Sequence, residues 1–174
     1  LKNAGADTLF LVGNVGPSAQ VVKSLDRMGW KPPIVSHWGP AGGRFTELAG
    51  PSAPSVHFVQ TYSFFGNQRP VGQKVLKALM AKYPDIKSAG DVTPAVGVAN
   101  AYDAMHLVAL AIKAAGTADG AKLREGFYKI GTYDGLIKTY KQPFSPSNHD
   151  AITENDYVWT QFIDHQILPV GMKK

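Results

Sequence analysis

The sequence contains no cysteine among its 174 residues. Thiolate nucleophiles, zinc–thiolate sites and disulfide bonds are therefore excluded together. Because a cysteine-free chain tolerates an oxidising space as well as the cytoplasm, this absence leaves the compartment open. Apolar runs are short, since none approaches the roughly 18 to 20 residues that a membrane-spanning helix needs. The longest apolar stretch, at 104–112, is interrupted by His106, and we expect it to form a buried core helix.

Concentrated charge is also missing. Lys and Arg number 18 against 13 Asp and Glu, but this surplus is scattered along the chain without a basic block. A nucleic-acid-binding protein would concentrate the positive charge on one face and interleave aromatic residues. We therefore expect no nucleic-acid partner. The remaining composition, with 44% hydrophobic and 18% charged residues, is typical of a globular protein.

The motifs of hydrolases and metal enzymes are absent as well. The sequence has no G-x-S-x-G elbow, no H-E-x-x-H and no paired-carboxylate motif. Asp103 and His106 lie three residues apart on one expected helix, but two ligands are too few for a defined metal site. Such a pair is more often a structural hydrogen bond. We therefore expect a protein that is not an enzyme, with no catalytic residue, no metal site and no cofactor.

The elements that are present alternate between strands and helices. The apolar run at 6–13 predicts a strand buried on both faces of a parallel sheet. A helical stripe follows from Pro17 to Gly29, and 32–36 predicts the next strand, which makes a βαβ unit. A short helix is predicted at 44–50 and a strand at 55–62. Three helices follow, at 70–83, at 94–115 with Thr93 as N-cap, and at 120–130 with Asp119 as N-cap. Two strands are predicted within 156–170, around a turn at Asp164-His165. This layout indicates an α/β fold with an antiparallel addition at its end.

The first turn, Gly13-Asn14-Val15-Gly16, resembles a phosphate-binding loop only superficially. A P-loop needs a lysine after its second glycine, and a dinucleotide fingerprint needs three glycines at fixed spacing. This turn has neither feature, so a nucleotide site is not predicted. In an open parallel sheet, ligands bind beyond the carboxyl ends of the strands. Asn14 is therefore placed to contact a ligand, and the alternative is a plain turn residue.

A second loop is expected at the same edge of the sheet. His37 and Trp38 directly follow the second predicted strand, so they emerge beside Asn14. Two loops that converge on one crevice would form a binding site. Trp38 offers a flat apolar face with one N–H donor for stacking a ligand, and the alternative is a tryptophan that covers the core.

The order of these segments is similar to that of a known family. The stretch from "LKNAGADTLFLVGNVGPS" to "SHWGPAGGRFTELAG" resembles the second lobe of type I periplasmic binding proteins of the leucine/isoleucine/valine-binding family, the substrate receptors of ABC importers. "GVANAYDAMHLVALAIKAAG" resembles that family's long helix, with its Tyr-Asp-Ala signature at residues 102–104. "TYDGLIKTYKQPFSPSNHDAI" and "YVWTQFIDHQILP" resemble its short strand, loop and terminal hairpin. The resemblance covers essentially all of this chain but only the second half of the family's usual chain.

The resemblance implies two doubly wound, three-layer α/β lobes joined by a hinge that closes on the ligand. Residues 1–60 would belong to the second lobe, 61–152 to the first lobe, and 153–174 to a terminal hairpin that returns to the second lobe. The N-terminal half of the protein would then be a separate, nicked or omitted piece, and strands without their partners would expose edges and apolar faces. The family also implies a periplasmic location, or an extracellular one with a membrane anchor.

Comparison with amino-acid-binding members of the family indicates which class of ligand this chain would bind. These proteins use a side chain at the position of Asn14 and a carboxylate at the position of Trp38 to hold the ligand's α-ammonium group. Tryptophan cannot neutralise a buried ammonium, which is costly to leave unpaired. Near the start of the long helix, Val96 and Gly97 replace a common aromatic residue, so the pocket would be roomier. The ligand-binding residues that this comparison implies are Gly13, Asn14, Val15, His37, Trp38, Tyr62 and Gly97.

The resemblance therefore implies a solute-binding subunit of an ABC importer of the branched-chain amino acid type. Its partners would be ABC permease subunits and a small organic solute, namely an amino acid, an aromatic or other carboxylic acid, or an amide. The departure at Trp38 favours an acid or an amide over a simple α-amino acid. The alternatives are a ligand-sensing regulatory domain of the same fold and a doubly wound α/β enzyme.

Overall fold

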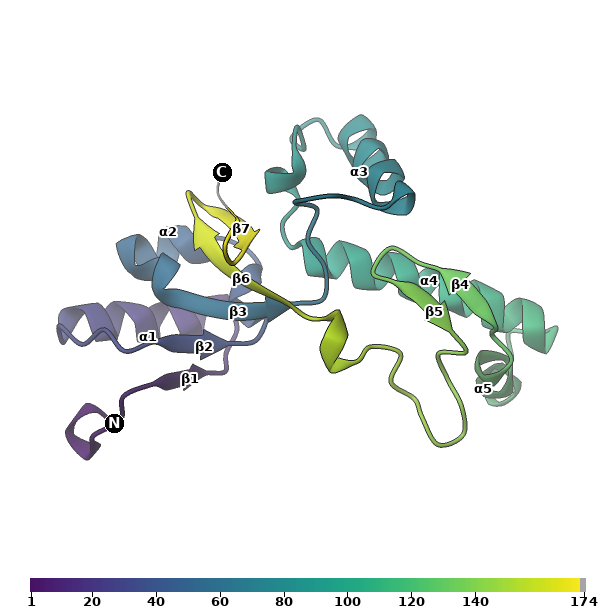
Figure 1. Ribbon diagram of the computed structural model, residues 1–174, viewed down its shortest axis with the longest axis horizontal. Helices are drawn as coiled ribbons and strands as arrows, with labels where there is room; N and C mark the ends of the chain where they lie inside the picture. The colour runs from purple at the N-terminus through teal and green to yellow at the C-terminus, as the bar shows by residue number, and fades with distance from the viewer. Residues whose placement is uncertain (173–174) are drawn as a thin grey trace.

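The computed structural model describes residues 1–172 and consists of two bodies joined by two connecting segments (Figure 1). The first strand and the last strand of the chain both lie in the first body, which we call the sheet body. Its strands are β1 (Leu9–Leu11), β2 (Ile34–Ser36), β3 (Val56–Gln60), β6 (Val158–Ile163) and β7 (Gln166–Pro169), and its α-helices are α1 (Val15–Arg27) and α2 (Phe45–Ala49). The second body, which we call the helical body, contains α3 (Pro70–Lys82), α4 (Ala95–Ala115), α5 (Gly120–Tyr128) and the hairpin of β4 (Thr132–Asp134) and β5 (Thr139–Lys141). The last two residues of the expected 153–174 segment lie outside the described residues.

The sheet has the order β1-β2-β3-β6-β7. The first three strands are parallel, as the βαβ pattern predicts, and β6 and β7 add antiparallel strands around the expected turn at Asp164-His165. One face of this sheet packs against α1 and α2. The core of the sheet body consists of apolar side chains from that face and from the helices: Leu11, Ala19, Val22, Leu25, Ile34, Ala41, Phe45, Ala49, Ala53, Val56, Phe58 and Phe162.

The opposite face of the sheet is uncovered among residues 1–172. Phe10 pairs with Val35 and Val59 pairs with Trp159, so these side chains share that face. Phe10 is 70% exposed and Trp159 is 49% exposed. The prediction that the first strand is buried on both faces is therefore wrong. Since β1 is the edge strand and all of the packed helices lie on one face, only alternate side chains of β1 can be buried.

Helix α4 is likewise buried on one side only. Its buried residues form a single stripe, whereas Met105 on the other side is 71% exposed, so the expected core helix is half uncovered. By length and composition alone α4 could cross a membrane, a property that core helices of soluble proteins share. The helix begins at Ala95, with Pro94 rather than Thr93 at the N-cap position. The prediction of a Thr93 cap is wrong because the backbone is still extended at Pro94, one residue later than the pattern indicates. The helix ends after residue 115, as predicted, because Gly116 adopts the left-handed conformation.

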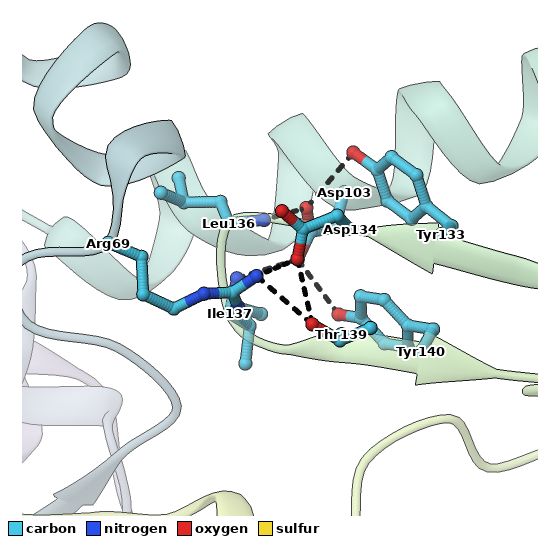
Figure 2. Close-up of polar contacts among 8 residues, drawn as sticks. All are labelled: Arg69, Asp103, Tyr133, Asp134, Leu136, Ile137, Thr139 and Tyr140. Carbon is cyan, nitrogen blue, oxygen red and sulfur yellow. Dashed lines mark hydrogen bonds and ion pairs between the residues drawn. The ribbon is translucent and has the colours of Figure 1, made fainter.

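A buried carboxylate attaches the β4–β5 hairpin to α4 (Figure 2). Asp103 Oδ1 accepts the Leu136 N–H at 2.6 Å, and Oδ2 accepts the Ile137 N–H at 2.9 Å. The hydroxyls of Tyr140 and Tyr133 also donate to this carboxylate, at 2.8 and 3.3 Å. The hydrogen bonds of Asp103 thus go to the hairpin and not to its expected partner His106, whose ring packs against Tyr133. Asp103 therefore has a structural role that the spacing of the Asp/His pair did not reveal.

The same carboxylate keeps its tyrosine partners neutral. Burial raises the pKa of Tyr140 far above its usual range, and the hydrogen bond to Asp103 and the negative charge of Asp103 raise it further. Burial and the Asp103 charge raise the pKa of Tyr133 in the same way. Both phenols therefore remain hydrogen-bond donors at physiological pH.

We expect Asp103→Asn to lower the free energy of unfolding by about 3 kcal/mol. An asparagine side chain keeps one acceptor oxygen, but its NH₂ group cannot accept the hydrogen bonds that the second carboxylate oxygen accepts. Buried N–H or O–H donors would then be left without a partner. The matched control is Asp134→Asn, which removes an exposed ion pair with Arg69 and should cost less than about 1 kcal/mol. Urea unfolding of the protein measures both values, and equal losses would contradict the structural role of Asp103.

Candidate functional site

The loops that follow β1 and β2 meet at the carboxyl edge of the sheet. The N–H of Gly13 points at His37 Nε2 at 3.2 Å, and the N–H of Gly39 points at His37 Nδ1 at 3.1 Å. The imidazole ring therefore lies between the two loops and holds them together. This placement agrees with the parallel pairing of Leu11 with Ser36, which brings the ends of β1 and β2 side by side.

Buried hydroxyls and a glycine tighten this contact. Ser36 Oγ donates to the Leu11 carbonyl at 2.6 Å, and Ser18 Oγ donates to the Gly13 carbonyl at 2.9 Å. A Cβ atom on Gly39 would overlap with both the Gly13 carbonyl oxygen and the His37 ring. The second loop consequently needs a glycine at this position, because its backbone approaches the first loop too closely for a side chain.

Asn14 and Trp38 remain available on the surface of the paired loops. Asn14 is the exposed N-cap residue of α1, and its side chain makes no capping hydrogen bond to that helix. Trp38 is 42% exposed, so it does not serve mainly to cover the core. Val15 is half-buried beside them, with one methyl carbon 3.8 Å from where a Cβ of Gly42 would stand. The paired loops thus present an aromatic face and an amide, groups that bind small molecules.

Two other predicted site residues lie at the connecting segments. Tyr62 lines a cavity of about 360 Å³ at the junction of the two bodies, whose walls also include Arg69, Ile137, Asn155 and Tyr157. Its hydroxyl donates to Gln68, and burial raises its pKa to about 12. Gly97 is exposed in the first turn of α4. The structure therefore brings the predicted residues of the two loops together, but the cavity beside Tyr62 includes neither Asn14 nor Trp38.

Sequence reasoning missed the contacts that fix the connecting segments to the helical body. Asn100 on α4 donates to Thr61 Oγ1 at 2.9 Å at the start of the first segment. Lys138 pairs with Asp156 at the end of the second segment. Burial alone would raise the pKa of Asp156, but hydrogen bonds from Lys138 and Thr153 outweigh it and lower that pKa. Asn100 and Thr61 are 39 positions apart in the sequence, and Lys138 and Asp156 are 18 positions apart. No local sequence pattern therefore predicts either contact.

The junction also contains one unusual polar group. Gln60, the last residue of β3, is fully buried, and its Oε1 atom accepts no hydrogen bond from residues 1–172. Among these residues no three His, Asp or Glu side chains come together in a way that could hold a metal ion.

We expect Gly39→Ala to lower the free energy of unfolding by about 2 kcal/mol, because the new methyl group forces the two loops apart. Gly42→Ala is the matched control in the same loop, since its Cβ would meet only Val15 at an ordinary contact distance. The control should change stability by less than about 1 kcal/mol. Thermal unfolding compares the variants, and a Gly39→Ala protein as stable as wild type would disprove the close approach.

Comparison with known proteins identifies the fold. A family model described as periplasmic binding protein matches residues 1–162. No curated protein sequence matches the chain. The solved structures that resemble it include a type 1 periplasmic binding protein from Bordetella pertussis Tohama I, with a TM-score of 0.79, 20% identity and coverage of 97% of this chain and 47% of that one.

Two further structures carry ligand names in their descriptions. The branched-chain amino acid transporter substrate-binding protein LivJ of Streptococcus pneumoniae, in complex with isoleucine, has a TM-score of 0.69, 22% identity and coverage of 95% of this chain and 44% of its own. A fatty acid ABC transporter substrate-binding protein from Thermomonospora curvata has a TM-score of 0.71, 16% identity and coverage of 98% and 43%. The chain thus spans about half the length of these proteins. The expected fold class is confirmed, and the chain belongs to the periplasmic binding protein family, with the type I fold.

Proposed function

We propose that this chain is part of an extracytoplasmic solute-binding subunit of an ABC importer, which captures a small organic solute and delivers it to permease subunits without chemical change. The observation that carries this proposal is the pairing of two loops through His37 at the carboxyl edge of the sheet. That edge is where ligands bind in open α/β sheets, and here it presents Asn14 and Trp38. Family membership supports the same role.

The two bodies correspond, in this proposal, to parts of two lobes. Residues 1–60 and the hairpin within 153–174 form part of the second lobe, and 61–152 form part of the first. Their apolar cores support this division, because the core of the sheet body shares no residue with the cores built from the helical body. The connecting segments would then cross the hinge of a closing cleft.

The missing part of both lobes is, we propose, the N-terminal half of the same protein. The sheet body exposes Phe10 and Trp159 on one face, with Val12 68% exposed at the edge, and α4 exposes Met105. Apolar surface of this kind marks a contact with another protein segment. The matched structures contain about as much chain again as this one, which is enough to cover both faces.

The solute is, in this proposal, an aromatic or other carboxylic acid or an amide. A half-exposed tryptophan can stack on a planar group but cannot neutralise an ammonium group. Proteins of this fold differ in their ligands, since the LivJ structure contains isoleucine and the Thermomonospora protein is described as a fatty acid binder. The residues that we propose to contact the solute are Gly13, Asn14, Val15, Trp38, Tyr62 and Gly97, with His37 behind them.

A thermal-shift panel on the full-length protein tests the solute class. We expect aromatic acids or amides to raise the melting temperature and branched-chain amino acids to leave it unchanged. Trp38→Ala should weaken binding of the stabilising compound about tenfold, or about 1.4 kcal/mol, while Trp38→Phe retains most of the affinity. Stabilisation by leucine-like amino acids alone would contradict the proposal.

Expression of residues 1–174 alone and together with the remaining half tests the proposed assembly. We expect the isolated chain to aggregate through its exposed sheet face and the co-expressed halves to form a one-to-one complex. Native mass spectrometry separates these outcomes. A single folded, monomeric species of 18.7 kDa would rule out the need for a second half.

A further inference from the structure

The contacts of His37 cannot all be hydrogen bonds at once. Both ring nitrogens face a backbone N–H donor, from Gly13 and from Gly39. A neutral imidazole has one acceptor nitrogen and one N–H group. It therefore accepts from only one of the two amides. Acceptance by Nε2 from Gly13 joins the two loops, whereas Gly39 lies in the same loop as His37.

Protonation removes the remaining acceptor. An imidazolium ring carries an N–H on both nitrogens and can accept neither the Gly13 nor the Gly39 donor. Its positive charge would also lie close to the N-terminus of α1, which has Asn14 as N-cap and no acidic residue in its first turn. The positive end of the helix dipole disfavours a cation there. Both effects act to separate the loops.

Among the described residues, His37 forms no ion pair with an acidic side chain. The side chain that reaches the Gly13 backbone from α1 is the neutral Ser18. The turn that begins at Gly39 contains Pro40 and Ala41, and beyond it Arg44 is paired with Glu47. The other described histidine hydrogen bonds differ, because His149 contacts the Tyr128 hydroxyl and His165 the Thr46 hydroxyl. A hydroxyl can donate or accept, so those contacts survive protonation.

We propose that His37 is a positioning residue whose neutral ring holds the loop between β1 and α1 against the loop after β2 and whose protonation separates them. Its consequence for solute binding rests on the proposed function, since these loops present Asn14 and Trp38. Acidification would then release the solute by moving the residues that contact it.

Nuclear magnetic resonance on the full-length protein tests the loop contact without a solute. The His37 ring and the Gly13 and Gly39 amide resonances are followed from neutral pH downwards until the ring is fully protonated. We expect both amides to shift with the midpoint of the ring and their exchange protection to fall about tenfold. In His37→Asn these pH-dependent shifts should vanish, whereas the control His149→Gln should retain them.

Benzamide, which does not titrate in this range, and benzoate serve as probes for the second step. We expect the affinity of a bound probe to fall about tenfold on acidification in wild type and to be independent of pH in His37→Asn. An unchanged wild-type affinity would overturn the link to solute binding. Gly13 and Gly39 amide resonances that stay unchanged while the His37 ring becomes protonated would overturn the positioning role itself. A normal loop titration without binding of either probe would instead contradict the proposed solute class.

Discussion

The parallel register of β1 and β2 determines where the candidate site lies. Leu11 stands opposite Ser36, and the Ser36 hydroxyl bonds the Leu11 carbonyl, so the two strands end at the same level. The first turn of each following loop must therefore emerge beside the other. His37 and Gly13 are in contact for this reason, and the neighbouring residues Asn14 and Trp38 are both exposed on the paired loops. A shift of one residue in this register would separate the loops and turn the buried side chains of β1 outward.

The helical body depends on a different kind of interaction. One carboxylate, Asp103, accepts hydrogen bonds from the β4–β5 turn and from two tyrosines, so a short hairpin is fixed on a long helix. Arg69 extends this arrangement to the start of α3 through Asp134 (Figure 2). The connecting segments are held by the same body, through Asn100 and Lys138. The sheet body is thus joined to a unit in which hydrogen bonds and ion pairs supplement two apolar cores.

Local patterns predicted most of the elements, because each depends on short-range periodicity and on punctuating residues. The strands at β2 and β3, the helix ending at Gly116 and the cap at Asp119 follow from such signals. The exposure of Phe10 could not be predicted from the strand's own residues, because burial of an apolar strand depends on its neighbours, whereas the resemblance to half of a longer chain did imply exposed apolar faces. The bonds of Asp103 reach backbone groups 33 and 34 residues away, and His37 reaches Gly13 across 24, so their partners had no local signal. The convergence of the two loops was predictable, since it needs only parallel strands, but the contacts of Asn14, Trp38, Tyr62 and Gly97 with a solute stay predictions.

The antiparallel pairing of β3 with β6 has a topological consequence. Gln60, where the chain leaves the sheet body, stands opposite Val158, where it returns. The helical body is therefore an insertion between two neighbouring strands of one sheet. The two residues occupy the positions of the closing pair of a β-hairpin, which a two-residue turn could join. With such a turn in place of the helical body, β3 would continue directly into β6 and the order of the five-stranded sheet would be unchanged.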